Sequence, residues 1–194
     1  MDRKEALDLV KKYIKNKNLI KHCLAVEAIM EGIAKELNKV KSKSKDKKLF
    51  DEKKWAITGL VHDIDYESTA KDPENHSLVG AEILEKNNFG EDIIYAVKAH
   101  NSIHNLPLQS NLDIALSATD PLSGLIVASA LIKPEKKIKV INTQFVLNRF
   151  KEKSFAEGAD RSQILACERI GLTLKEFIEI ALISMQKIDE DLGL

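Results

Sequence analysis

Apolar residues recur at helical spacing along nearly the whole chain. They fall at positions i, i+3, i+4 and i+7, which places them on one face of an α-helix. No convincing run alternates with period two, and aromatic residues make up only 5% of the chain, so strands are not indicated. The pattern predicts an all-α fold, with helices over 3–16, 22–39, 51–62, 74–88, 91–101, 111–119, 122–132, 138–149, 158–170 and 173–190.

Several of these helix ends carry recognisable signals. Asp72 followed by Pro73 is typical of an N-cap with proline at the first helical position, so a helix is expected to start there. Pro121 allows one helix to end before it and another to restart directly after it. Thr173 and Glu176 have capping-box spacing. No repeat or long linker interrupts the series, which favours one domain over residues 1–194.

Composition supports a soluble globular domain and argues against a nucleic-acid binder. Hydrophobic residues make up 44% of the 194 residues and charged residues 31%. The 30 basic and 30 acidic residues give a formal net charge of +0, so no general basic field would hold nucleic acid. One basic cluster occurs, and we expect it to be a solvated loop between helices. It consists of Lys39, Lys41, Lys43, Lys45, Lys47 and Lys48.

Cysteine usage and hydropathy favour a cytoplasmic protein without a membrane partner. Cys23 and Cys167 lie far apart and form no CxxC motif, so we expect two core residues in a reducing compartment rather than a thiolate zinc site. The longest apolar run, Leu125–Ile132, is well below the roughly 18 residues that cross a membrane. The apolar segment FIEIALISM near the C-terminus could cover the core or form a homodimer face.

Polar residues fall on the apolar side of several predicted helices. Each lies at i+3, i+4 or i+7 from apolar residues of its own helix. These residues are His22, His62, His76, His100 and Asp120. An inward imidazole or carboxylate costs free energy unless it is hydrogen-bonded, paired or bound to a metal. If these side chains converged on one divalent-metal site, metal binding would offset the cost of burying all of them.

The adjacent His62 and Asp63 in GLVHDIDYE are consistent with the same site. At a helix end the backbone leaves helical geometry, so two neighbouring side chains can bind one ion, or the carboxylate can bridge two. Imidazole nitrogen and carboxylate oxygen suit Fe, Mn, Zn, Co or Ni. Without thiolates, a catalytic site with open positions is expected rather than a structural one. The alternative is a helix end whose polar residues meet water.

The order His22, His62–Asp63, Asp120 resembles the H…HD…D signature of the HD-domain superfamily of metal-dependent phosphohydrolases, whose scaffold is an all-α helical bundle. The resemblance covers roughly residues 18–132, and residues 133–194 would be additional packing helices. It implies a phosphomonoesterase or phosphodiesterase that acts on a small phosphorylated molecule. It also implies a first metal ion held by His22, His62, Asp63 and Asp120.

Branches of that superfamily with two further histidines hold a second ion. They include the HD-GYP phosphodiesterases, the bacterial diadenosine tetraphosphate hydrolases and the di-iron oxygenases. His76 and His100 stand in the corresponding places, which implies a second ion with Asp63 as the bridge. Asn101 stands where many members have another histidine, and the HD-GYP sequence is absent. His104 is then either a substrate contact or a surface histidine.

The resemblance implies that metal-activated water attacks phosphorus. We expect Asp63 and Asp65 to be the catalytic carboxylates. Asp65 and Glu67 would orient ligand histidines or move protons, unless they are simple helix-end acids. Lys21 and Lys71 are the nearest candidates in sequence for contacting a phosphate. Two other functions remain open: a di-iron oxygenase on the same fold, and a non-catalytic helical signalling module.

Overall fold

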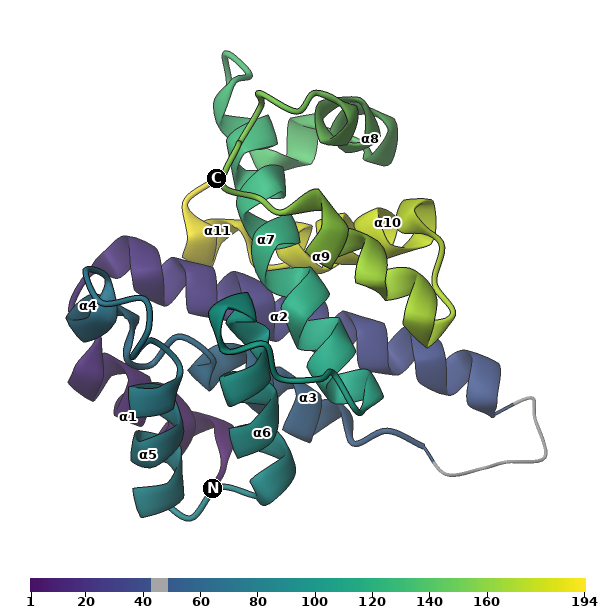
Figure 1. Cartoon of the computed structure of the whole chain (residues 1–194). Helices are drawn as coiled ribbons and strands as arrows, with labels where there is room; N and C mark the ends of the chain where they lie inside the picture. Colours follow the sequence, from purple (N-terminus) through teal and green to yellow (C-terminus); the bar gives the residue numbers. More distant parts are fainter. Residues whose placement is uncertain (43–48) are drawn as a thin grey trace.

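Every regular element in the described part of the chain is helical, in a computed structural model that describes residues 1–42 and 49–194 (Figure 1). The predicted all-α fold class is therefore confirmed. The longer helices are α1 (Arg3–Tyr13), α2 (Lys17–Lys41), α3 (Glu52–Val61), α5 (Leu78–Lys86), α6 (Glu91–His100), α7 (Asn111–Leu131), α8 (Thr143–Lys151) and α10 (Leu174–Gln186). The short elements are α4 (Tyr66–Thr69), η1 (Ser102–His104), η2 (Ile138–Val140), α9 (Arg161–Leu165), η3 (Ala166–Ile170) and α11 (Asp189–Leu192).

Helix α7 runs through the middle of the molecule and contacts α2, α6, α8, α9 and η3 (Figure 1). By length and composition it is the one helix among the described residues that could cross a membrane, in contrast to the shorter apolar run expected from sequence. However, 72% of its most apolar stretch is buried inside the fold. It therefore has the surroundings of a central core helix.

Two hydrophobic cores surround the region where the polar residues gather. The larger core joins α2, α7, α8 and α10, and the smaller one joins α1, α3, α5 and α6 to the start of α2. Cys23 is buried in the smaller core and Cys167 in the larger one, as expected for core cysteines.

A glycine permits a close contact between the backbones of α2 and α3. Gly59 of α3 lies against the backbone of α2, where an added Cβ would be 2.7 Å from the Val26 carbonyl oxygen and 2.9 Å from the Glu27 nitrogen. Any larger residue would separate α2 from α3. The glycine of the GLVHD sequence thus brings the end of α3 next to the start of α2.

Several predicted boundaries were wrong. Helix α7 continues through Pro121, although proline removes a backbone hydrogen bond, because Leu116, Leu122 and Leu125 on both sides of it are buried in one core. Helix α5 starts at Leu78 rather than at 74, because Ser77 has a left-handed backbone (φ 69°) that ends the preceding turn.

Other segments also differ from prediction. Helix α2 starts at Lys17 and continues to Lys41, so Lys39 and Lys41 are helical, and Lys43, Lys45, Lys47 and Lys48 lie outside the described residues. The predicted helices 138–149, 158–170 and 173–190 are each divided into two elements. The Thr173 capping box is confirmed.

Candidate metal centre

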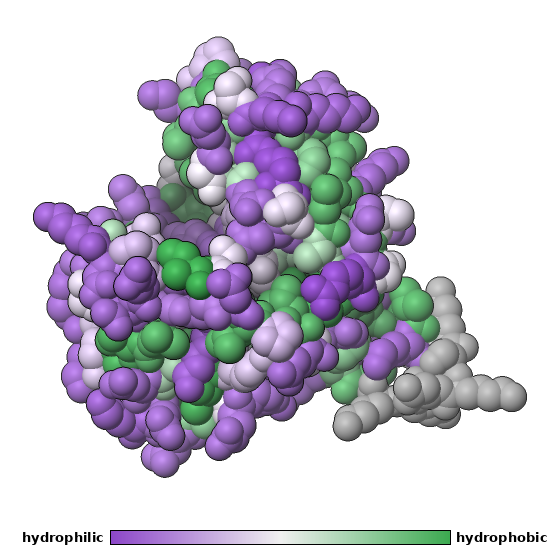
Figure 2. Space-filling model, viewed as in Figure 1, coloured by the Kyte–Doolittle hydropathy of each residue, from purple (hydrophilic) through white to green (hydrophobic). Residues whose placement is uncertain are grey.

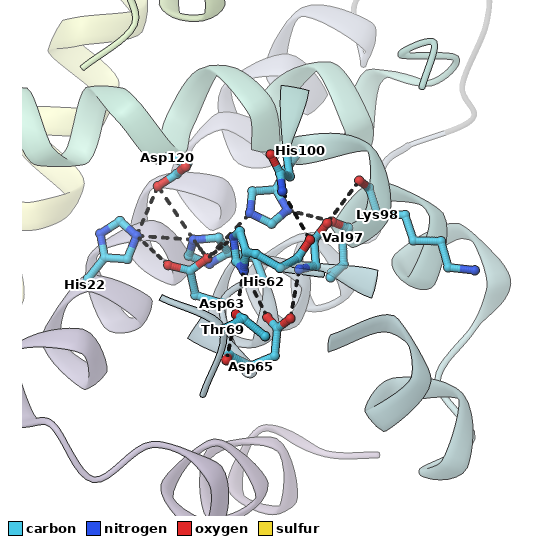
Figure 3. Close-up of polar contacts among 12 residues, drawn as sticks. His22, His62, Asp63, Asp65, Thr69, Val97, Lys98, His100 and Asp120 are labelled. Carbon is cyan, nitrogen blue, oxygen red and sulfur yellow. Dashed lines mark hydrogen bonds and ion pairs between the residues drawn. The ribbon is translucent and has the colours of Figure 1, made fainter. Parts of the chain in front are cut away.

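Six side chains from five parts of the chain meet at one place (Figure 3). Two come from within long helices, two from the end of α3, one from the end of α6 and one from the turn before α5. They are His22 on α2, Asp120 on α7, His62 and Asp63 directly after α3, His100 as the last residue of α6, and His76. All six were predicted as metal ligands.

The four imidazole rings form a row. Neighbouring ring centroids are 5.0 Å apart for His22 and His62, 5.2 Å for His62 and His100, and 5.2 Å for His100 and His76. His22 and His76 therefore lie at opposite ends, and His62 and His100 lie between them. This order follows from the α2–α3 contact at one end and the α3–α6 contact in the middle.

Asp63 contacts the whole row. Its Oδ1 atom is 3.5 Å from His62 Nε2, 3.4 Å from His76 Nε2 and 3.5 Å from His100 Nε2. Its Oδ2 atom is 3.4 Å from His22 Nε2. The two oxygens thus face different parts of the row, which is the geometry that a bridging carboxylate needs.

Asp120 lies at the His22 end. Its Oδ1 atom is 3.0 Å from His22 Nε2 and 3.7 Å from His62 Nε2. Because it sits within α7, it is carried by the central helix of the larger core. The structure therefore groups Asp120 with His22 and His62, and away from His76.

Backbone carbonyls fix the orientation of the two central histidines. His62 Nδ1 is 2.8 Å from the Gly59 carbonyl oxygen, and His100 Nδ1 is 2.6 Å from the Val97 carbonyl oxygen. A carbonyl can only accept, so each Nδ1 carries the hydrogen and donates it. In the neutral ring, Nε2 is then left with a lone pair directed at the centre of the cluster.

His22 has the same orientation through a serine. Its Nδ1 atom is 3.1 Å from Ser123 Oγ, and that hydroxyl donates its own hydrogen to the Asp120 carbonyl oxygen at 2.9 Å. Ser123 therefore accepts from His22 Nδ1. Ser123 lies three residues after Asp120 on the same helix, so helical spacing could have identified it, although the sequence analysis did not.

Asp65 orients the fourth histidine from behind. Its Oδ1 atom is 3.2 Å from His76 Nδ1, and its Oδ2 atom accepts the Ser77 backbone N–H at 2.8 Å. A Cβ at Gly80 would be 3.0 Å from Asp65 Oδ1, so glycine leaves room for this carboxylate. Asp65 is buried and faces His76 rather than the centre, which favours the orienting role over proton transfer.

These contacts produce a site that needs a cation. The Nε2 atoms of His22 and His62 are 3.2 Å apart, and two lone pairs at that distance repel unless a proton or metal ion lies with them. The nitrogen–oxygen separations of 3.0 to 3.7 Å resemble the roughly 3.0–3.5 Å between two ligands that are each about 2.1 Å from one ion. The donor set therefore fits a divalent transition metal.

Three overlapping groups of donors among the described residues could each hold an ion. Their donor atoms lie within 4.8 Å of one another. The groups are His22, His62 and Asp63; His62, His100 and Asp120; and Asp63, His76 and His100. The first and third share only Asp63, so two ions could be held side by side.

The charges of the cluster are strongly coupled. Burial opposes protonation of His22, but hydrogen bonds and charge from Asp120 and Asp63 raise its pKa to about 10. Burial would raise the pKa of Asp63, but the neighbouring His62, His100 and His22 hold it well below its usual range. Without a metal ion, the site therefore holds a proton between its carboxylates and imidazoles.

The cluster is open at one end. The side chains of Asp120 and His22 are 34% and 25% exposed, whereas those of His62 and His100 are 0% and 2% exposed. Figure 2 shows that this face of the molecule is hollowed between the part around α4 and α5 and the part around α7 and α8. The open end of the cluster is therefore at His22 and Asp120, and His62 and His100 form its buried floor.

Other candidate residues lie outside the cluster. Glu67 accepts the backbone N–H groups of Lys15 and Asn16 at 2.5 and 3.0 Å, so it ties the α1–α2 turn to α4. The Lys98 side chain points away from the cluster (Figure 3). Lys21 lies beside Gly193, where an added Cβ would be 2.7 Å from Lys21 Nζ.

Two aromatic residues near His76 have contacts that the sequence did not predict. Tyr66 is 38% exposed, and its ring meets the His76 ring edge to face, with centroids 5.1 Å apart. His104 is half-buried in η1, and its Nε2 atom donates to the His76 carbonyl oxygen at 2.8 Å. It therefore supports the turn that carries His76.

Comparison with known proteins agrees with this arrangement. The HD domain family matches residues 19–128, more than half of the chain and a range that contains all six clustered residues. The chain therefore belongs to the HD domain family, within a superfamily of metal-dependent phosphohydrolases.

Similar curated proteins carry the name ribonuclease Y. The chain is 32% identical over 109 residues to ribonuclease Y of Nitratidesulfovibrio vulgaris (strain DP4), covering 56% of this chain and 18% of that protein. It is 30% identical over 122 residues to ribonuclease Y of Lawsonia intracellularis (strain PHE/MN1-00), covering 63% and 21%. The chain thus spans about a fifth of the length of these relatives. No solved structure shows significant similarity to it.

Proposed function

We propose that this protein is a metal-dependent hydrolase that cleaves a phosphoester bond in a small phosphorylated molecule. One observation carries the proposal: the Nδ1 atoms of the four clustered histidines face partners outside the cluster, while their Nε2 atoms face Asp63 or Asp120. Membership of the HD domain family supports phosphoester chemistry at this cluster.

The proposed ligand sets divide the row into two halves. His22, His62, Asp63 and Asp120 would hold a first divalent ion, and His76 and His100 would hold a second, with Asp63 between them. Fe, Mn, Zn, Co and Ni all suit this donor set. When bound, such ions polarise water and phosphoryl oxygens and so promote attack on phosphorus.

The protein's own residues would position and shield the reaction. The buried rings of His62 and His100 exclude water from the floor, because neither side chain has appreciable exposed surface. His22 and Asp120 line the open edge, so the phosphate would enter there. Asp65 would keep the His76 ring in the orientation that presents Nε2 to the centre.

The test is elemental analysis of protein purified without chelators or metal-affinity steps, followed by assays on chromogenic phosphomonoesters and phosphodiesters. We expect about two equivalents of a transition metal and hydrolysis that is lost in Asp63→Asn. The matched control is Asp92→Asn, which removes a carboxylate paired with Lys54 at 2.8 Å outside the cluster. A protein that takes up no Mn, Fe, Co, Ni or Zn would contradict the proposal.

A second candidate substrate is RNA, because the relatives matched over this segment are named ribonuclease Y. The formal net charge of +0 argues for small substrates instead. Cleavage of short RNA at rates above those for small phosphodiesters would favour RNA as the substrate.

Running all assays with and without oxygen distinguishes hydrolysis from the di-iron oxygenase alternative. Metal uptake without any turnover would favour a non-catalytic module.

A further inference from the structure

His76 is held differently from the other clustered histidines. The preceding helix, α4, ends at Thr69 and α5 starts only at Leu78, so His76 lies in an irregular turn. The turn's own hydrogen bonds, from the Asn75 and His76 N–H groups to the Asp72 carbonyl oxygen at 3.1 Å, hold its first part, whereas the His76 carbonyl oxygen is bonded by side chains from outside the turn. The position of the His76 ring therefore depends on contacts from outside the turn.

These contacts converge on one peptide group, which joins His76 to Ser77. Its carbonyl oxygen accepts two hydrogen bonds, from His104 Nε2 at 2.8 Å and from Asn101 Nδ2 at 3.1 Å. Its N–H donates to Asp65 Oδ2 at 2.8 Å. The carbonyl group and the N–H group of this peptide are thus both fixed by side chains from other segments.

The same contacts compensate for a strained backbone. Ser77 is fully buried and has a φ of 69°, a left-handed conformation that costs a non-glycine residue of the order of 1 kcal/mol. Asn101 also donates to the Pro73 carbonyl oxygen at 3.0 Å, which fixes the start of the turn. Without these donors, the turn would relax and the His76 ring would leave its place.

We propose that Asn101 and His104 are positioning residues that set the affinity of the second metal ion, an inference that rests on the proposed function. They act through the His76 carbonyl oxygen and not as ligands, because Asn101 Nδ2 and His104 Nε2 both donate to it. His22, His62, Asp63 and Asp120 make none of these contacts. Loss of the two donors is therefore expected to weaken binding of the second ion and to leave binding of the first ion unchanged.

The test is calorimetric titration of metal-depleted protein with Mn²⁺, together with elemental analysis after desalting. We compare wild type with Asn101→Ala and His104→Ala. Wild type is expected to bind two ions. Each variant should bind the first ion as wild type does and the second ion with about 10- to 100-fold lower affinity, which is the usual loss when a residue that orients a metal ligand is removed. His104→Gln should restore the second ion, because its amide nitrogen can replace Nε2 as the donor.

Asn38→Ala is the matched control. Asn38 is a buried asparagine whose side chain ties down Phe50 with two hydrogen bonds, of 3.0 and 2.8 Å, far from the cluster. Its loss should lower the melting temperature and leave both ions bound. If Asn101→Ala unfolds, Asn101→Ser replaces it. In wild type, Asn101 Oδ1 accepts the Ile103 N–H at 3.2 Å, and the serine hydroxyl can still accept this hydrogen bond.

The outcomes separate this inference from the proposed function. Two ions bound with wild-type affinity in the Asn101 and His104 variants would overturn the positioning role alone. One ion in wild type, unchanged in the variants, would also overturn it and leave a one-ion hydrolase. A wild type that binds no ion would overturn both.

Discussion

The two ends of the histidine row are supported in different ways. At one end, His22 and Asp120 sit within α2 and α7. The other side chains of these helices form much of the larger core and, at the start of α2, part of the smaller one. At the other end, His76 sits in a turn that three outside side chains hold in place. We therefore expect the first end to be as stable as the fold itself, and the second end to change without unfolding the protein.

This difference suggests a division of labour between the two proposed ions. The His22 end is preformed by helix packing, so an ion there gains affinity from a rigid donor set. The His76 end must first be ordered by hydrogen bonds, and part of the binding free energy is lost if they are absent. Variants that separate fold stability from metal affinity test this comparison directly.

The largest effect is expected from Gly59→Ala, which acts on the helix-held end. The new Cβ would be 2.7 Å from the Val26 carbonyl oxygen, so α2 and α3 must separate, at a cost of about 3 kcal/mol in unfolding free energy. Urea unfolding of the ion-free protein measures this. Gly124→Ala in α7 is the control: no atom lies within 4 Å of its Cβ, so it should be neutral or stabilise by up to ~1 kcal/mol. Equal stability of the two variants would contradict the packing argument.

The second largest effect is a pH dependence of metal binding at the His22 end. Because Asp120 and Asp63 raise the pKa of His22 to about 10, an ion must displace a proton there at neutral pH. The apparent affinity for the first Mn²⁺ should rise by about tenfold per pH unit between roughly pH 6.5 and 8.5. Calorimetric titrations across this range measure the affinity, and an affinity that does not change with pH would contradict the prediction.

In the ion-free protein, the same proton stabilises the fold fully below about pH 6.5, and this contribution is lost as pH rises toward 10.

How much of this could be predicted from sequence also differs between the two ends. His22 and Asp120 are recognisable because each shares a helical face with apolar residues, and both helices exist. His76 was placed on a helix that starts at 74, and that argument was wrong, because the helix starts at Leu78. Only the family resemblance pointed to His76. The left-handed Ser77 has no signal in a single sequence, since serine is common in ordinary turns.

A smaller effect is expected from Gly80→Ala, which acts on the turn-held end. The added Cβ would be 3.0 Å from Asp65 Oδ1 and would move that carboxylate away from His76. We expect about tenfold weaker binding of the second ion. The unfolding free energy should change by less than about 1 kcal/mol, because alanine favours the helix. Mn²⁺ titration and urea unfolding together check this, and weakening of the first ion instead would show that the two ends are not separable.

The smallest effect is expected from Glu67→Gln. Glu67 lies close in sequence to Asp65, but its carboxylate accepts the N–H groups of Lys15 and Asn16. These hydrogen bonds hold the pKa of Glu67 below its usual value, so the charged form is the one used. The variant should melt at a slightly lower temperature and bind metal as wild type does. Loss of either ion would mean that Glu67 acts on the cluster after all.

The apolar character of α7 has a consequence for how this protein can be handled and how it folds. The helix is long and apolar enough to be a membrane span, and within the fold α8, α9, η3 and α10 pack against it. The matched family segment ends at residue 128, before any of these covering helices. A chain shortened to that segment would expose the hydrophobic surface of α7, and we expect it to aggregate. During synthesis, the same surface stays uncovered until residues after 140 emerge, so chaperone binding to nascent chains should concentrate in that interval.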